Sequence, residues 1–84
     1  MTETDRKKTE LEKEIDAYEY LEEHLVGSLT ALKEHVTEKL IKYFVNAGII
    51  AYGIDAIAEE RYRVTLKGKK IIDLTLRALY LKLV

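Results

Sequence analysis

The stretch from Asn46 to Ile72, which reads NAGIIAYGIDAIAEERYRVTLKGKKII, constrains the fold of this chain more than any other segment. Gly48 is suited to end a helix, because glycine adopts the left-handed backbone conformation that follows many helices. Residues 49–65 are rich in β-branched and aromatic types, which is typical of a two-stranded β-ribbon. Thr65 can then cap a further helix. The sequence therefore predicts an α+β fold, mainly helical, in which helices flank a ribbon.

The chain has 84 residues, which favours a single domain over residues 1–84. It has no cysteine, so disulfides, thiolate metal ligands and thiol catalysis are excluded. No apolar run approaches the roughly 18 residues of a membrane-spanning helix, and the charged start MTETDRKKTELEKE lacks the apolar segment of a signal peptide. A cytoplasmic location without a membrane partner is expected.

Apolar side chains at helical spacing predict two helices in the first half of the chain, over about residues 5–25 and 29–47. The first apolar stripe is Leu11, Ile15, Tyr18, Leu21 and Leu25, and the second is Leu29, Leu32, Val36, Leu40, Ile41, Phe44 and Val45. Gly27 is a suitable stop between the two helices. One long bent helix is the alternative, because a glycine costs only about 1 kcal/mol inside a helix.

The last helix is predicted over residues 66–83, and two apolar stripes run along it. One stripe is Ile71, Leu74, Ala78 and Leu81, and the other is Ile72, Leu76, Leu79 and Leu83. A small monomer has difficulty covering a helix that is apolar on so many sides, so part of it is expected to pack against a second copy of the chain. The predicted homodimer interface consists of Leu74, Leu76, Leu79, Leu81 and Leu83.

Charge is distributed unevenly along the chain, although the net charge is only −1. Residues 1–24 hold nine acids and four bases, whereas residues 61–70 hold five bases and no acid. Such polarity can orient a polyanion toward the basic segment and away from the acidic one. The alternative interpretation is that both segments are ordinary solvated faces.

The order of features over about residues 29–76 resembles the second half of a winged helix-turn-helix domain of the small archaeal, viral or bacterial regulator type. In that family the recognition helix ends in a Gly-Leu-Ile-like turn, which here is Gly48-Ile49-Ile50. The strand and helix that follow carry an aromatic-x-aliphatic-Thr-x-x-Gly-x-x-aliphatic-aliphatic pattern, which here is Tyr62, Val64, Thr65, Gly68, Ile71 and Ile72. The family places two short helices before the turn, and residues 29–35 and 37–47 would provide them only with an abrupt corner.

The resemblance implies that the chain binds double-stranded DNA as a small transcriptional regulator and acts as a homodimer. Lys39, Lys42 and Asn46 would lie on the exposed side of the recognition helix, where lysines suit phosphates and asparagine suits a base edge. The other predicted DNA-binding residues are Arg61, Arg63, Lys67, Lys69 and Lys70. Alanine at both arginines is expected to weaken duplex binding. The ribbon tip, Asp55 to Glu60, is acidic and apolar, which suits phosphate poorly.

The sequence predicts a binding protein rather than an enzyme. It contains no glycine-rich phosphate loop, no G-x-S-x-G and no H-E-x-x-H, so we expect no catalytic residue, cofactor, metal or small-molecule substrate. His24 and His35 are expected to be surface histidines. The alternative function is a protein-interaction or structural module that forms a helical oligomer without nucleic acid.

Overall fold

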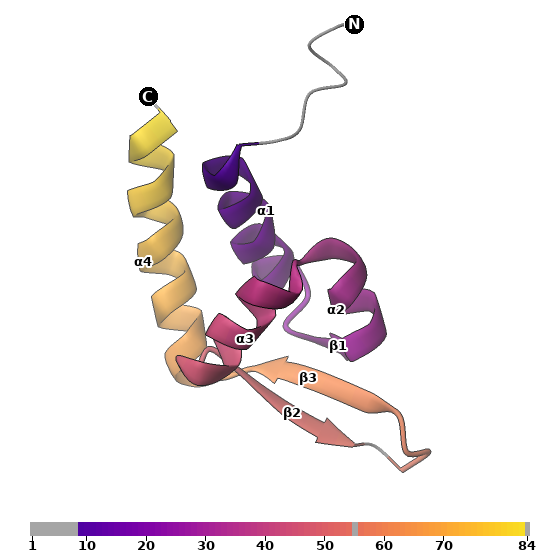
Figure 1. The fold of residues 1–84 in the computed structure, drawn as a ribbon. Helices are drawn as coiled ribbons and strands as arrows, with labels where there is room; N and C mark the ends of the chain where they lie inside the picture. Colours follow the sequence, from indigo (N-terminus) through magenta and orange to yellow (C-terminus); the bar gives the residue numbers. More distant parts are fainter. Residues whose placement is uncertain (1–8, 55, 84) are drawn as a thin grey trace, which may run out of the picture.

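The computed structural model describes residues 9–54 and 56–83 and shows an α+β fold (Figure 1). In chain order the elements are α1 (Glu10–Glu23), β1 (Val26–Ser28), α2 (Leu29–His35), α3 (Glu38–Asn46), β2 (Ile50–Ile54), β3 (Glu60–Val64) and α4 (Leu66–Leu83). Residues 5–8 of the predicted first helix and Asp55 of the predicted ribbon tip lie outside the described residues. No helix in the described residues is both long and apolar enough to cross a membrane.

The α1 helix begins with a capping box and ends before the predicted glycine stop. The Thr9 hydroxyl accepts a hydrogen bond from the Glu12 backbone N–H, and the Glu12 side chain accepts one from the Thr9 backbone N–H. These reciprocal bonds satisfy two backbone donors that a helix start would otherwise leave unpaired. The helix ends at Glu23, and the chain then enters β1. A single bent helix through Gly27 is therefore excluded.

The predicted helix over residues 29–47 is in fact two helices, α2 and α3. The break is at Val36, whose extended backbone (φ −130°, ψ 136°) ends α2, and Thr37 then caps α3 by accepting from the Leu40 backbone N–H at 3.3 Å. Any L-residue can adopt this extended conformation, so the corner requires no glycine. The buried Val36 side chain joins the core at this corner. The apolar spacing continues unchanged across Val36, so the pattern predicted one helix where the structure has two.

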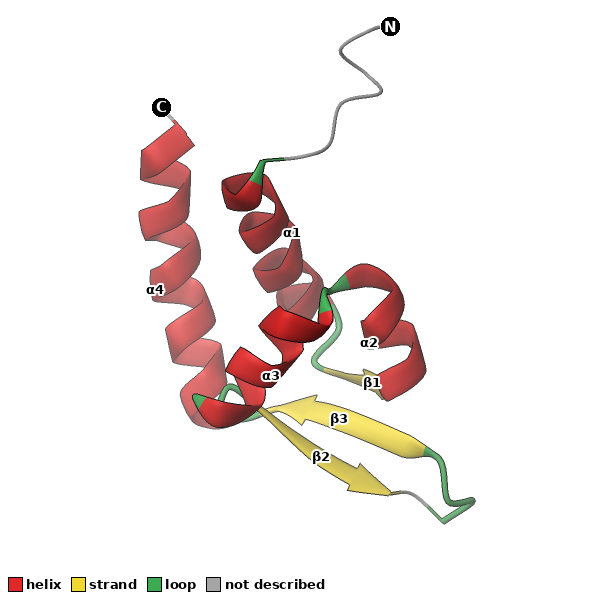
Figure 2. Cartoon of the chain, in the orientation of Figure 1, coloured by secondary structure: helices red, strands yellow, loops and turns green. Residues whose placement is uncertain are grey.

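The sheet has three antiparallel strands in the order β1-β3-β2, not the two predicted (Figure 2). The added strand, β1, pairs with β3 through Val26–Arg63 and Ser28–Arg61. The three residues of β1 are too few to show the alternation that marks a strand. Tyr62 on the central strand is buried, and its hydroxyl donates to the His24 carbonyl at 2.6 Å. Tyr62 is therefore a core residue that ties the sheet to the end of α1.

The α1 and α4 helices lie side by side and contribute to one hydrophobic core (Figure 1). On α4 the stripe that enters this core includes Ile72, Leu76 and Leu79, all at most 5% exposed. Leu76 and Leu79 are therefore misplaced in the predicted dimer interface, because their side chains are covered within a single chain. Leu74 and Leu81 of the other stripe remain exposed. The helical rotation between the two stripes explains why one is inside and one outside.

The turn after α3 is closed by a Schellman motif. Gly48 has φ +76°, the Gly48 N–H donates to the Val45 carbonyl at 3.1 Å, and the Ile49 N–H donates to the Phe44 carbonyl at 2.8 Å. These two bonds satisfy carbonyls that the helix end would leave unpaired. Phe44 and Ile49 are both fully buried, which adds the hydrophobic contact that usually accompanies this motif. Gly48 and Ile49 are thereby held in one conformation.

The Thr-x-x-Gly pattern at the start of α4 packs directly on this turn. The Thr65 hydroxyl accepts from the Gly68 N–H at 2.8 Å, and it donates to the Gly48 carbonyl at 2.6 Å. The Thr65 N–H donates to the Ile49 carbonyl at 3.0 Å. A Cβ atom at Gly68 would lie far inside the 3.0 Å that real Cβ atoms keep from other atoms, against the carbonyl of Ile49. Thr65 and Gly68 therefore set how α4 is seated on the end of α3.

Two tyrosines of the core are expected to make the protein sensitive to alkali. Burial raises the pKa of Tyr18 to about 12, with smaller contributions from Tyr43 and Glu14, and burial together with Tyr20 raises the pKa of Tyr62 to about 12. A tyrosine in the unfolded chain ionises near pH 10, so between about pH 10 and 12 the unfolded state releases protons that the folded state retains. The contribution of these two tyrosines to stability should be level below about pH 10 and fall above it.

This pH dependence is measured by urea unfolding at a series of pH values, together with tyrosinate absorbance. Replacing Tyr62 with Phe should reduce the alkaline loss of stability relative to the wild type, although the lost hydrogen bond to His24 lowers stability at every pH. If every tyrosine ionised near pH 10 while the folded state kept its full stability, the assignment of Tyr18 and Tyr62 as buried phenols would be wrong.

Candidate nucleic-acid interface

One face of α3 gathers the residues that could touch nucleic acid. Lys39, Lys42 and Asn46 are all exposed, and their spacing of three and four places them on the side of α3 opposite the buried Ile41 and Phe44. The helix is strongly amphipathic because its aliphatic residues and Phe44 lie toward the core. Two ammonium groups and one carboxamide therefore lie together on a rigid, solvent-facing helix surface.

Tyr43 also lies toward this surface and was not among the predicted site residues. It is 51% exposed, and its ring is 6.0 Å from that of Phe44, measured between centroids. Its helical position, one residue after Lys42 and three before Asn46, is the sequence signal that could have identified it. An exposed phenol beside lysines can stack on a base or donate a hydrogen bond to a phosphate.

Of the three lysines at the start of α4, Lys67 and Lys70 share a helix face and Lys69 is turned away from them. Lys67 lies against the end of α3, since its ammonium would be 3.6 Å from a Cβ built on Gly48. A cation there interacts favourably with the negative end of the helix dipole. Lys69 is two residues further along α4, which turns its side chain roughly 200° away from that of Lys67. Among Lys67, Lys69 and Lys70, the contact with the end of α3 is made by Lys67.

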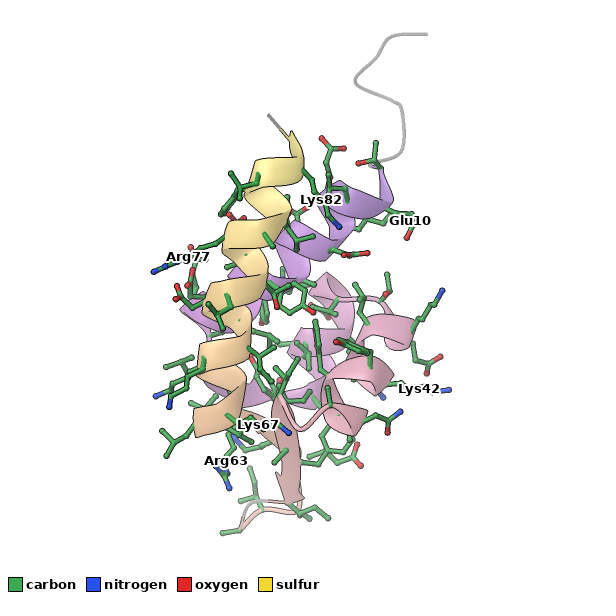
Figure 3. The ribbon with its side chains drawn as sticks, turned by 90° about the vertical axis from the view of Figure 1, so that its left-hand side faces the viewer. Glu10, Lys42, Arg63, Lys67, Arg77 and Lys82 are labelled. Atoms are coloured by element: carbon green, nitrogen blue, oxygen red, sulfur yellow. The ribbon has the colours of Figure 1, made fainter. Side chains whose placement is uncertain are left out.

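The two arginines of β3 lie on the outer face of the sheet. They alternate with Tyr62 and Val64, whose side chains enter the core, so Arg61 and Arg63 must point the opposite way. Figure 3 shows Arg63 and Lys42 on opposite sides of the molecule. Arg61 is also paired with a carboxylate, because its Nη1 atom lies 3.3 Å from Oε1 of Glu59. The arginines therefore do not extend the α3 surface.

The basic side chains of residues 61–70 do not all share one face. Alternation along the strand places Arg61 and Arg63 together on the outer face of the sheet, whereas the 100° rotation per residue in the helix turns Lys69 away from Lys67. The surface that the structure assembles consists of Lys39, Lys42 and Asn46, with Lys67 near its C-terminal end. We call this set the α3 surface.

The described part of the ribbon tip carries exposed apolar side chains. Ile54 is 71% exposed and Ile57 is 80% exposed, and Glu59 and Glu60 are exposed beside them. Carboxylates repel phosphates, so this tip is unsuited to contact with a nucleic-acid backbone.

The two histidines stack on one tyrosine. The ring of Tyr20 lies 4.3 Å from that of His24 and 4.7 Å from that of His35, between centroids, and the planes are nearly parallel. Because Tyr20 lies on α1 and His35 on α2, this stack is a contact between the two helices. Over residues 9–54 and 56–83, no three histidine or acidic side chains are grouped as a metal site would require.

Comparison of the chain with protein-family models, with curated proteins and with solved structures found no match.

Proposed function

We propose that this protein binds double-stranded DNA through the α3 surface, as a small transcriptional regulator of the winged helix-turn-helix type. The observation that carries the proposal is the pair of short helices, α2 and α3, that precedes the Gly48 turn and the ribbon. The sequence resemblance called for two such helices at this place. In a helix-turn-helix unit the second helix is the one that enters the major groove.

The chemistry of the α3 surface supports this role. Lys39 and Lys42 suit phosphate oxygens, and Asn46 suits an adenine edge because a carboxamide can donate and accept at once. All three side chains are exposed, and a helix holds them at fixed spacing. Binding of this kind is non-enzymatic and needs no cofactor. We also propose a cytoplasmic location, because a regulator of this kind meets DNA in that compartment.

A titration of the protein with duplex DNA at increasing salt tests the proposal. Each lysine that neutralises a phosphate contributes about −0.9 to the slope of log affinity against log salt, so three lysines predict a slope of roughly −3 for one chain. Single-stranded DNA of the same length is the control. Binding that does not depend on salt, or the absence of binding at low salt, would contradict the proposal.

We further propose that the protein acts as a homodimer through the exposed stripe of α4. Leu74 is 65% exposed and Leu81 is 75% exposed, and they are two helical turns apart on one side of the helix with Ala78 between them. Burying a leucine contributes about 1.5–3 kcal/mol, so two from each chain can hold a pair of helices together. A dimer of this kind would present two α3 surfaces to paired half-sites.

The variant Leu74→Glu/Leu81→Glu is expected to be monomeric at concentrations where the wild type is dimeric, because it would place four carboxylates in the interface. Both positions are exposed, so the fold of the single chain should survive. Light scattering gives the mass, and far-ultraviolet circular dichroism checks the fold. The exposed Lys69→Glu on the same helix is the matched control, which should remain dimeric. A monomeric wild type would refute the homodimer.

The second candidate function is a protein-interaction module without nucleic acid. The exposed Ile54 and Ile57 favour it, since solvent-facing apolar side chains next to acids are typical of protein contacts. The duplex titration separates the two candidates, because this alternative predicts no DNA binding.

A further inference from the structure

A groove of about 590 Å³ opens between α1, α3 and α4. Its apolar walls come from all three helices and include Tyr18, Leu40, Tyr43 and Leu79. Leu74 and Ala78 of the proposed dimer stripe also line its α4 edge, so the ligand site and the dimer interface adjoin. Small-molecule sites commonly have volumes of about 300–1,000 Å³ and mainly apolar walls with a few polar groups. The groove is thus large enough for a ligand of one ring with a short side chain.

The floor and the rim of this groove differ in burial. Tyr18 and Leu79 are at most 5% exposed and belong to the core, and the Tyr18 ring meets Phe44 edge-on at 5.1 Å between centroids. The rim residue Tyr43 is half exposed. A ligand would therefore meet a packed, preformed floor, while the rim side chains could adjust around it.

The charges at the rim select the sign of the occupant. Lys39 projects from α3 and Lys82 from α4, and Glu14 on α1 is the single acid that lines the described groove. Figure 3 shows the Lys82 side chain extending from α4 toward α1. The rim therefore has a net charge of +1, and this complements one negative charge. Two lysines on separate walls can hold one carboxylate between them.

We propose that the groove binds a small amphipathic monoanion, an aromatic or branched carboxylate, with its charged end between Lys39 and Lys82 and its apolar body against Tyr18, Leu40 and Leu79. The Tyr43 hydroxyl on the groove wall can donate to the same carboxylate. This binding does not depend on whether the chain binds DNA.

The site also deepens the proposed function, and this step rests on it. Lys39 belongs both to the groove rim and to the α3 surface. An ammonium held by a ligand carboxylate is less available to a phosphate, so the bound anion should weaken duplex binding. The ligand would then act as an inducer that releases the protein from DNA.

The first experiment follows backbone amide chemical shifts while phenylacetate is added to the full chain without DNA. Phenethyl alcohol and phenethylamine serve as neutral and cationic controls of similar shape. We expect saturable shifts at the groove residues Leu40, Tyr43 and Thr75, with phenylacetate bound at least about tenfold more tightly than phenethylamine. Equal affinity for the two probes, shifts elsewhere, or no shift up to about 10 mM would overturn the proposal.

Variants identify the charged residues. Lys39→Gln/Lys82→Gln should weaken phenylacetate binding about tenfold and leave the affinity for phenethyl alcohol unchanged, whereas Lys33→Gln/Lys69→Gln, which removes the same charge outside the groove, should change neither. Equal losses in both double variants would overturn the assignment. Shifts at Tyr18 and Leu40 that depend on protein concentration alone would show that a second copy fills the groove, which would also overturn it.

A second experiment adds phenylacetate to the protein–duplex complex. We expect weaker duplex binding in the wild type and no effect of the anion in Lys39→Gln/Lys82→Gln. If phenylacetate binds in the groove but the protein does not bind duplex, the proposed DNA function fails while the ligand site stands.

Discussion

Replacing Gly68 with Ala is expected to destabilise the protein by about 3 kcal/mol, although alanine is the better helix former by about 1 kcal/mol. The added methyl group would collide with the carbonyl group of Ile49. This group is part of the backbone, so it cannot turn aside as a flexible side chain could. Relief requires α4 to move off the α3 turn, which would break the hydrogen bonds of Thr65 to Gly48 and Ile49. Overpacking of this kind costs about 1–3 kcal/mol, and each lost hydrogen bond adds about 1 kcal/mol.

The size of this effect relative to total stability makes it easy to measure. A domain of this length is stable by roughly 4–13 kcal/mol, so urea denaturation should show a large shift of the midpoint. Gly53→Ala is the matched control, because no atom lies within 4 Å of a Cβ built there and the residue is exposed. It should leave stability unchanged or raise it by up to about 1 kcal/mol, because alanine restricts the unfolded chain. A Gly68→Ala variant as stable as the control would mean that α4 does not pack on Ile49.

The variant Lys39→Ala/Lys42→Ala is expected to weaken duplex binding at least about tenfold near 0.1 M salt and to reduce the salt slope by about 1.8. Both lysines are exposed, so their removal should leave the fold and its stability nearly unchanged. The loss should be similar for different duplex sequences, because phosphate contacts do not distinguish bases. Asn46→Ala, in contrast, should reduce discrimination between sequences and leave the salt slope intact.

Arg61→Ala/Arg63→Ala is the control. It also removes two positive charges, but from the outer face of the sheet and not from α3. The basic segment in the sequence favours a large effect of this variant, whereas the structure favours a small one, since Arg61 is paired with Glu59 and Arg63 points away from Lys42 (Figure 3). A loss equal to that of the lysine variant would show that net charge, and not the α3 surface, governs binding. A larger loss would transfer the binding site to the sheet.

Local signals in the sequence identified the joint that organises this fold. Gly48 is suited to a left-handed helix end and Thr65 to a helix cap, and both properties depend on the residue and its immediate neighbours. The alternation around Tyr62 likewise depends only on strand geometry, which places one face inside and one outside. These features were therefore readable without knowledge of contacts between distant residues, and so was the exposed side of α3.

Contacts between distant residues decided the rest. Val36 ends α2 only because its side chain is buried in the core, and β1 is a strand only because β3 offers it hydrogen-bonding partners. Periodicity shows that α4 has two apolar stripes, but packing against α1 decided that Leu76 is inside and Leu74 outside. In the same way, the sequence does not show which way the basic side chains from Arg61 to Lys70 point. Their directions depend on how β3 and α4 are placed in space. Sequence patterns record local backbone preferences, whereas the direction of each side chain depends on what the rest of the chain covers.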